Sequence, residues 1–172
     1  MSINSEIIYK CWKKINNSIK KRIYIISNFN LLEKQFIKLK YPIKFIKVKN
    51  IYQNSNDTRL KIIDINLKFK NAFKIPSVSS SKFIIDSLNY AHKVAQDLNV
   101  SGMINCPINK KLLNKSNIGV TEYLASKSNI KDHSEVMLIH NDIISVSPVT
   151  THIDLKDVPK KISKKIIIKK II

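Results

Sequence analysis

The sequence predicts an α/β fold, a layered sheet with flanking helices. Segments with helical apolar spacing alternate with short isoleucine-rich runs along the first part of the chain, and this alternation is typical of α/β layers. The chain has 172 residues, of which 44% are hydrophobic. That length allows a sizeable buried core.

The N-terminal part is expected to contain two helices and three strands. Ser5 is a candidate cap for a first helix running from Glu6 to about Lys20, where apolar residues recur at helical spacing. A second helix is expected over residues 31–40. The strands are expected at "RIYIIS", "IKFIKV" and "LKIIDINLKF".

The clearest predicted helix lies in "IPSVSSSKFIIDSLNYAHKVAQDLNV", with serines at 79–81 as cap candidates. His92 falls inside it and is interpreted as a surface or packing residue. Residues 100–105 are expected to form a strand, and Asn109 to cap a short helix through Leu113. A strand that leads into a helix N-terminus presents free amides, which favours an anion there.

The C-terminal part is expected to hold a helix at "VTEYLASKS" and a hairpin formed by "SEVMLIHND" and "IISVSPVTTH". The hairpin turn is expected at Asn141-Asp142. A last helix is expected to be capped at Ser163 and to end on exposed isoleucines. Such an apolar end indicates a covering partner, which is more chain, a second subunit or a membrane surface.

The net charge of +19 arises from 31 Lys and Arg against 12 Asp and Glu. Arg22 and Arg59 are the only arginines. Base readout favours arginine forks, and single-strand binding favours aromatic residues interleaved with basic ones. We therefore favour a compositional bias toward lysine over a functional basic surface, and we do not expect nucleic-acid binding.

No apolar run approaches the ~20 residues that span a bilayer, so no membrane partner is expected. The opening "MSINSEIIYKCWKK" lacks the apolar core of a secretory signal, which favours a cytoplasmic location. Two distant cysteines, Cys11 and Cys106, are expected to be buried or half-buried free thiols.

Three segments are candidates for a functional site: "NCPINK", "GVTEYLA" and "SPVTTHIDLKDVP". Each places polar side chains after an apolar run or at a helix start. In open α/β sheets, ligands bind beyond the carboxyl ends of the strands, and imidazole is a common ligand for divalent metals. One histidine does not make a metal site, so the spacing leaves His152 open as either a loop residue or a ligand.

The segments "INCPINKKLLN", "GVTEYLAS" and "SVSPVTTHIDLKDVPKKIS" together resemble the 4-hydroxythreonine-4-phosphate dehydrogenase family of vitamin B6 biosynthesis. The resemblance covers nearly the whole chain but only the N-terminal half of the family. It implies that residues 1–172 form one truncated dehydrogenase-like region. The implied fold is the N-terminal part of a two-lobed isocitrate or isopropylmalate dehydrogenase-like architecture.

The resemblance also implies a homodimer, a divalent metal (Zn, Mg or Co) held by three histidines, and NAD or NADP as oxidant. The implied reaction is oxidation, with loss of carbon dioxide, of a phosphorylated hydroxy-amino acid, 4-phosphooxy-L-threonine. By that resemblance Lys110 is a catalytic residue, Thr121 binds substrate and His152 is the first metal ligand.

This chain departs from the family pattern at several positions. Val120 stands where the family has a histidine, and Cys106 stands where it has a glycine. The Asn-Pro-His and Tyr-His-Asp-Gln contexts of the other two metal histidines do not occur. Two interpretations therefore stay open: a divergent or truncated enzyme, and a non-catalytic lobe that needs a second chain.

Overall fold

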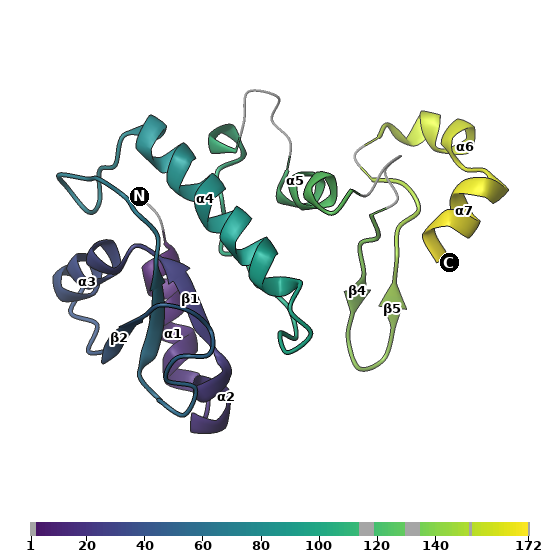
Figure 1. Cartoon of the computed structure of the whole chain (residues 1–172). Helices are drawn as coiled ribbons and strands as arrows, with labels where there is room; N and C mark the ends of the chain where they lie inside the picture. Colours follow the sequence, from purple (N-terminus) through teal and green to yellow (C-terminus); the bar gives the residue numbers. More distant parts are fainter. Residues whose placement is uncertain (1–2, 114–118, 130–134, 152, 172) are drawn as a thin grey trace. The chain divides into compact units, whose positions relative to one another are not determined.

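The computed structural model describes residues 3–113, 119–129, 135–151 and 153–171 (Figure 1). The chain divides into two compact units, Met1–Asn117 and Ile118–Ile172, and each is taken by itself.

The first unit is a parallel sheet with helices, as the sequence predicts for the fold class. The strands are β1 (Tyr24–Ser27), β2 (Phe45–Val48) and β3 (Leu60–Asp64), in the order β1-β3-β2. Both neighbour pairs are parallel, with Ile25 opposite Ile62 and Val48 opposite Ile63. The helices are α1 (Asn4–Lys14), α2 (Asn17–Arg22), α3 (Phe29–Lys38), α4 (Ser77–Ala95) and the 3-10 turn η1 (Lys110–Leu112).

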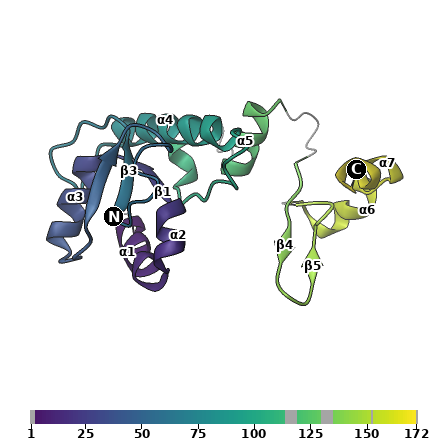
Figure 2. The ribbon, with the colours of Figure 1, turned by 60° about the horizontal axis from the view of Figure 1, so that its bottom comes forward.

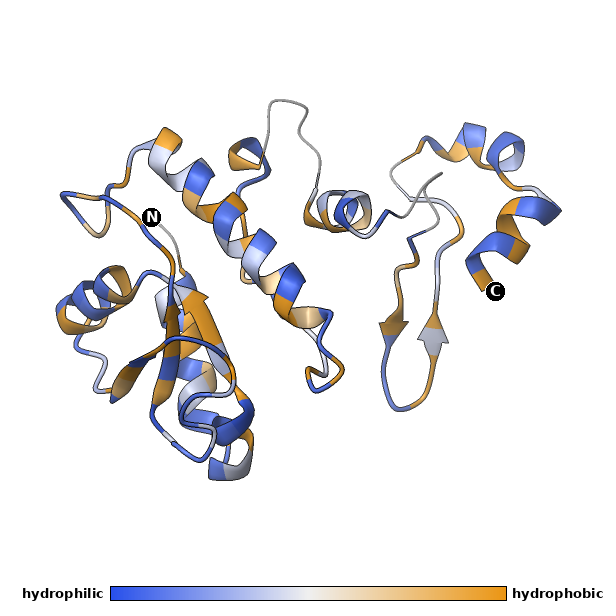
Figure 3. Ribbon diagram, in the orientation of Figure 1, coloured by the Kyte–Doolittle hydropathy of each residue, from blue (hydrophilic) through white to orange (hydrophobic). Residues whose placement is uncertain are grey.

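Helices α1 and α3 cover one face of this sheet. Trp12 from α1 and Leu32 and Phe36 from α3 pack on Leu60 and Ile62 of β3. Both β3 residues are fully buried, and each such side chain contributes about 1.5–3 kcal/mol by leaving water. Helix α4 contacts β1 and runs along the other side of the sheet from α1 (Figure 2). The hydropathy colouring shows how apolar these strands are (Figure 3).

The prediction of a single N-terminal helix from Glu6 to about Lys20 is wrong. The chain forms two helices there, α1 and α2. Asn16 takes an extended conformation, and its side chain accepts the backbone N–H of Ile19 at 2.9 Å. Asparagine is among the residues most favoured at the N-cap of a helix. Asn16 therefore starts a new helix. Ser5 is not a cap either. It lies buried inside α1, where its hydroxyl donates to the side chain of Gln35.

Three further expectations for the first unit are wrong. Residues 100–105 form no strand, since Gly102 adopts a φ of +154° that interrupts a regular extended backbone. Strand β3 ends at Asp64 instead of continuing to Phe69. The serines at 79–81 do not cap α4, whose N-cap position is Pro76 without a side-chain cap bond.

The second unit contains α5 (Val120–Lys127), β4 (Ile139–His140), β5 (Ser145–Val146), η2 (Leu155–Asp157), α6 (Val158–Lys161) and α7 (Lys164–Ile171). The predicted hairpin is confirmed, although its strands are short. Ile139 lies opposite Val146, and Asn141 closes the turn by accepting the N–H of Ile144 at 2.8 Å. Ser163 caps α7 as predicted, accepting the N–H of Ile166 at 3.3 Å.

Within the described residues, no helix combines the length and apolarity that a bilayer crossing requires.

Candidate functional site

Lys110 opens η1 at the end of the "NCPINK" segment, and its side chain is exposed. The backbone beneath it is well anchored. Asn109 caps the turn as predicted, accepting the N–H of Lys111 at 3.1 Å. Ser81 of α4 donates to the carbonyl of Leu112 at 2.6 Å, and Leu113 is 1% exposed. The fold thus fixes the loop while leaving the Lys110 ammonium accessible to a ligand.

Thr121 lies in the first turn of α5, with its side chain exposed. Gly119 is the N-cap, and the Glu122 carboxylate folds back over it. A carboxylate in this position complements the positive end of the helix dipole. The half-buried Val120 next to Thr121 can neither donate a hydrogen bond nor take up a proton. This helix start therefore offers one hydroxyl where the family resemblance implies a histidine-threonine pair.

His152 lies outside the described residues, between Thr151, which is exposed, and Ile153. Lys110 belongs to the first unit and Thr121 to the second. The three predicted site residues are therefore not brought together within one described unit.

The described ranges contain no group of three His, Cys, Asp or Glu side chains that could hold a metal ion. His92 lies on α4. His140 lies in β4, where its Nδ1 is 2.7 Å from the Ser145 hydroxyl. Catalytic zinc sites use about three protein ligands. The described side chains therefore do not fit a divalent metal site, and no chemical step through a metal follows from them.

Both cysteines are free. Cys106 is half-buried as expected, but the expectation is wrong for Cys11, which is exposed. Burial raises the pKa of the Cys106 thiol, and the charge of Cys11 raises it further. A thiol with a raised pKa is a poor nucleophile at neutral pH, so Cys106 is not a candidate catalytic group.

A polar cluster that sequence reasoning did not single out lies at the carboxyl end of the sheet. Asp64 ends β3, and its Oδ1 accepts the backbone N–H of Phe29 at 2.8 Å and the Asn28 amide at 3.3 Å. The Lys47 ammonium of β2 lies 2.6 Å from Asp64 Oδ2. Asn28 also caps α3, accepting the N–H of Leu31 at 2.9 Å.

This cluster positions α3 against the sheet. Both Asp64 oxygens have partners. The side-chain amide of Asn28 donates to Asp64 and also to the Ile65 carbonyl, at 2.9 Å. Ligands of parallel sheets bind at this edge of the sheet. Polar side chains whose hydrogen bonds are already made within the protein, however, are poor candidates for binding a ligand. The available signal was a polar residue at the end of each of two apolar runs, Asn28 after "RIYIIS" and Asp64 within "LKIIDINLKF".

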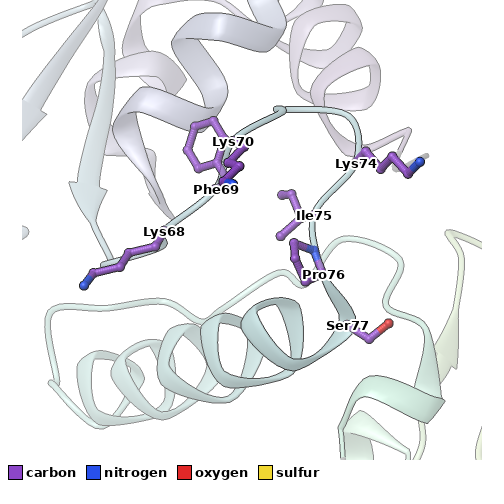
Figure 4. A pocket seen from close by; sticks show the side chains of 7 residues that line it. All are labelled: Lys68, Phe69, Lys70, Lys74, Ile75, Pro76 and Ser77. Atoms are coloured by element: carbon purple, nitrogen blue, oxygen red, sulfur yellow. The ribbon is translucent and has the colours of Figure 1, made fainter.

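A hollow in the first unit lies along the loop that leads into α4 (Figure 4). Its lining consists of Lys68, Phe69, Lys70, Lys74, Ile75, Pro76 and Ser77. Lys68 and Lys74 extend away from one another rather than toward a common point (Figure 4). Lys68 and Lys74 therefore do not converge on a position where they would fix a phosphate group.

Comparison with known families gives one match over most of the chain. The sequence profile of pyridoxal phosphate biosynthetic protein PdxA matches residues 18–172. A curated relative from Aquifex aeolicus, a 4-hydroxythreonine-4-phosphate dehydrogenase, is 35% identical over 138 residues, covering 78% of this chain and 41% of the relative. One of the same name from Sulfurihydrogenibium is 30% identical over 173 aligned positions, covering 98% of this chain and 52% of the relative.

A solved structure gives the same fold. The crystal structure of a 4-hydroxythreonine-4-phosphate dehydrogenase from Burkholderia phymatum superimposes with a TM-score of 0.83 at 18% identity. The superposition covers 99% of this chain and 52% of the solved chain. The chain thus spans about half the length of the relatives it matches. Because the profile matches nearly all of its residues, the chain belongs to the family of pyridoxal phosphate biosynthetic protein PdxA.

Proposed function

We propose that this chain supplies one side of the active site of a 4-hydroxythreonine-4-phosphate dehydrogenase-like enzyme. The proposed reaction is the metal-dependent, NAD- or NADP-linked oxidation of 4-phosphooxy-L-threonine, with decarboxylation, in the cytoplasmic synthesis of pyridoxine and pyridoxal 5'-phosphate. The observation that carries this proposal is the family match over residues 18–172. A relative from Bradyrhizobium diazoefficiens is named a putative D-threonate 4-phosphate dehydrogenase, so a related phosphorylated hydroxy acid is the alternative substrate.

Three residues carry the proposed roles. Lys110 acts at the reacting substrate through its exposed ammonium, Thr121 binds the substrate through its hydroxyl, and His152 ligates the metal through its imidazole. The exposure of Lys110 and Thr121 supports their roles. A bound metal and a nicotinamide would together supply a Lewis acid and a hydride acceptor.

The proposed site needs ligands beyond those that the described residues offer. The described residues offer no three-ligand cluster, and the chain spans about half of its relatives. The remaining ligands would come from the other half of the family's fold, carried by further chain or by a separate polypeptide, or from another copy of this chain. One histidine completed only by water would hold a metal weakly.

The test is to assay nicotinamide reduction with 4-phosphooxy-L-threonine, NAD or NADP, and Zn²⁺, Mg²⁺ or Co²⁺. We expect no turnover by the chain alone. We expect turnover when a polypeptide with the other half of the Sulfurihydrogenibium relative is added, and its loss in His152→Ala. The matched control is His92→Ala on α4, which is expected to keep the turnover. Turnover that survives His152→Ala would contradict the assigned metal role.

A non-catalytic lobe is the second candidate, and Val120 favours it because a histidine's proton-handling group is missing beside Thr121. Under this alternative the assembled protein binds partners but never reduces the nicotinamide. Absence of turnover with every metal, in an assembly whose association has been demonstrated by sedimentation, would select this alternative.

A further inference from the structure

The two cysteines of the chain are far apart in sequence but belong to the same compact unit. Cys11 lies on α1, and Cys106 lies in the segment that leads into η1. Position 106 is a glycine in the family pattern, so the family resemblance does not imply this pair of thiols. The pair is therefore a feature of this chain that its proposed function does not use.

A hydrogen bond joins α1 to the segment that carries Cys106. The side-chain amide of Asn4 donates to the Pro107 carbonyl at 3.5 Å. Asn4 and Cys11 are seven residues apart on this helix, which is close to two full turns, so both lie along the same side of it. The residue next to Cys106 is thus held against the side of α1 that carries Cys11.

The two thiols also influence each other electrostatically. Burial raises the pKa of the Cys106 thiol most, and the charge of Cys11 raises it further. Charges in salt solution act over only about 10 Å. The electrostatic effect and the Asn4 hydrogen bond therefore agree that the two sulfur atoms lie near each other.

The segment around Cys106 has the freedom to bring the two thiols into bonding distance. A disulfide requires Cα atoms about 4.4–6.8 Å apart. Residues 100–109, all of which the structure describes, form no helix or strand. Ile104 is 100% exposed, and its neighbour Asn105 is exposed as well. Few contacts hold this backbone in place, whereas Cys11 is fixed on a regular helix.

We propose that Cys11 and Cys106 form a reversible internal disulfide by exchange with a small disulfide of the glutathione class. The exposed Cys11 thiolate attacks one sulfur of the small disulfide, which gives a mixed disulfide and releases one small thiol. The Cys106 thiolate then attacks the Cys11 sulfur, which forms the internal S–S bond and releases the second small thiol. The protein loses two electrons and two protons, and both are carried away by the two small thiols.

The internal disulfide ties the "NCPINK" segment to α1. The proposal does not depend on the proposed dehydrogenase activity, because it concerns thiol exchange alone.

The experiment equilibrates the full chain with mixtures of reduced and oxidised glutathione and measures the intact mass after acid quenching. We expect a single-chain species that has lost two hydrogens and carries no glutathione. Its equilibrium constant is expected to be at least about tenfold larger in buffer than in urea, because the fold holds the two thiols near each other. An equal constant in urea, glutathione adducts alone, or disulfides between chains would each overturn the proposal.

A relocated thiol tests whether the side of α1 matters. Cys11→Ser combined with Lys13→Cys keeps two thiols at nearly the same separation in sequence. Position 13 lies about 200° around the helix axis from position 11, and Lys13 is exposed, so the substitution spares the fold. This variant is expected to collect glutathione adducts and to form the internal disulfide at least about tenfold less favourably. An equilibrium constant equal to that of the unaltered chain would contradict the proposal.

Discussion

The Nζ atom of Lys61 lies 4.7 Å from the centre of the Tyr24 ring. The two residues are opposite each other in the parallel pairing of β1 and β3. Lys61 is fully buried, and its ammonium donates to the carbonyls of Lys20, Lys21 and Asp57, each at 3.0 Å. Burial lowers the pKa of Lys61, and the Asp57 charge partly offsets this. One cation thus joins the end of α2 to the start of the central strand.

Lys61→Ala is expected to lower the free energy of unfolding by about 2–4 kcal/mol, because it leaves buried carbonyls unpaired and opens a cavity. Urea unfolding followed by the fluorescence of Trp12, the only tryptophan, measures the loss. Lys44→Ala is the control, since Lys44 is exposed, and its effect is expected to stay within about 0.5 kcal/mol. Equal losses for the two variants would show that the ammonium contributes little.

Arg59 controls the protonation of Asp57. Hydrogen bonds from the Arg59 side chain, and next from its backbone N–H, hold the pKa of Asp57 at about 2, below its ordinary 3.8. A lowered carboxyl pKa contributes stability above the unfolded value, and this contribution is lost as the pH falls from 3.8 toward 2. Carbonyl NMR titration is expected to give a midpoint near 2 for Asp57. In Arg59→Ala the titration midpoint of Asp57 is expected to rise toward 3.8. In the control Arg22→Ala this midpoint is expected to remain unchanged.

The sequence was informative where apolar runs decide the structure by themselves. The runs that became β1 and β3 are short and isoleucine-rich, and the spacing around Leu88 predicts α4. It was less informative where one side chain competes with the backbone pattern. Asn16 divides the first helix, and Gly102 prevents a strand. Neither effect alters the apolar periodicity from which elements are predicted.

The features of the candidate site were likewise predictable only in part. The motifs around Lys110 and Thr121 were identified by resemblance, and local rules predicted the Asn109 cap correctly. The Asp64 cluster was missed because its meaning depends on partners far away in sequence, Phe29 and Lys47. Buried Lys61 was missed for the same reason, since a lysine in an alternating strand is ordinarily predicted to face water.

Gln35 connects three segments of the first unit. It accepts from the Ser5 hydroxyl of α1, and its Nε2 donates to the Ala72 carbonyl at 2.7 Å. Gln35→Ala is expected to cost about 1–3 kcal/mol of unfolding free energy, because both buried partners lose their bonds. Asn30→Ala on the exposed side of the same helix is the control. A cost for Gln35→Ala no larger than for Asn30→Ala in urea unfolding would contradict the bridging role.

Val120→His tests the helix start beside Thr121. If the proposed dehydrogenase assembly is active, a histidine at position 120 would supply a group that can donate and accept a proton. This group would lie next to the Thr121 hydroxyl that is proposed to bind the substrate. Turnover is then expected to rise by about 10²–10⁴-fold, the usual contribution of general acid–base catalysis. Val120→Asn is the control of polarity without proton transfer. A pH profile that is identical in Val120→His and Val120→Asn would mean that position 120 handles no proton.

The two thiols are expected to differ in reactivity. Burial raises the pKa of Cys106, so less thiolate is present at neutral pH, while Cys11 is exposed. Cys11 is expected to react with a disulfide reagent at least about tenfold faster, since the thiolate is the nucleophile. Timed reactions of Cys11→Ser and Cys106→Ser measure each remaining thiol by itself. In urea the two rates are expected to converge, because unfolding removes the burial that protects Cys106. A difference that persists in urea would assign the slow reaction to the neighbouring sequence and not to the fold.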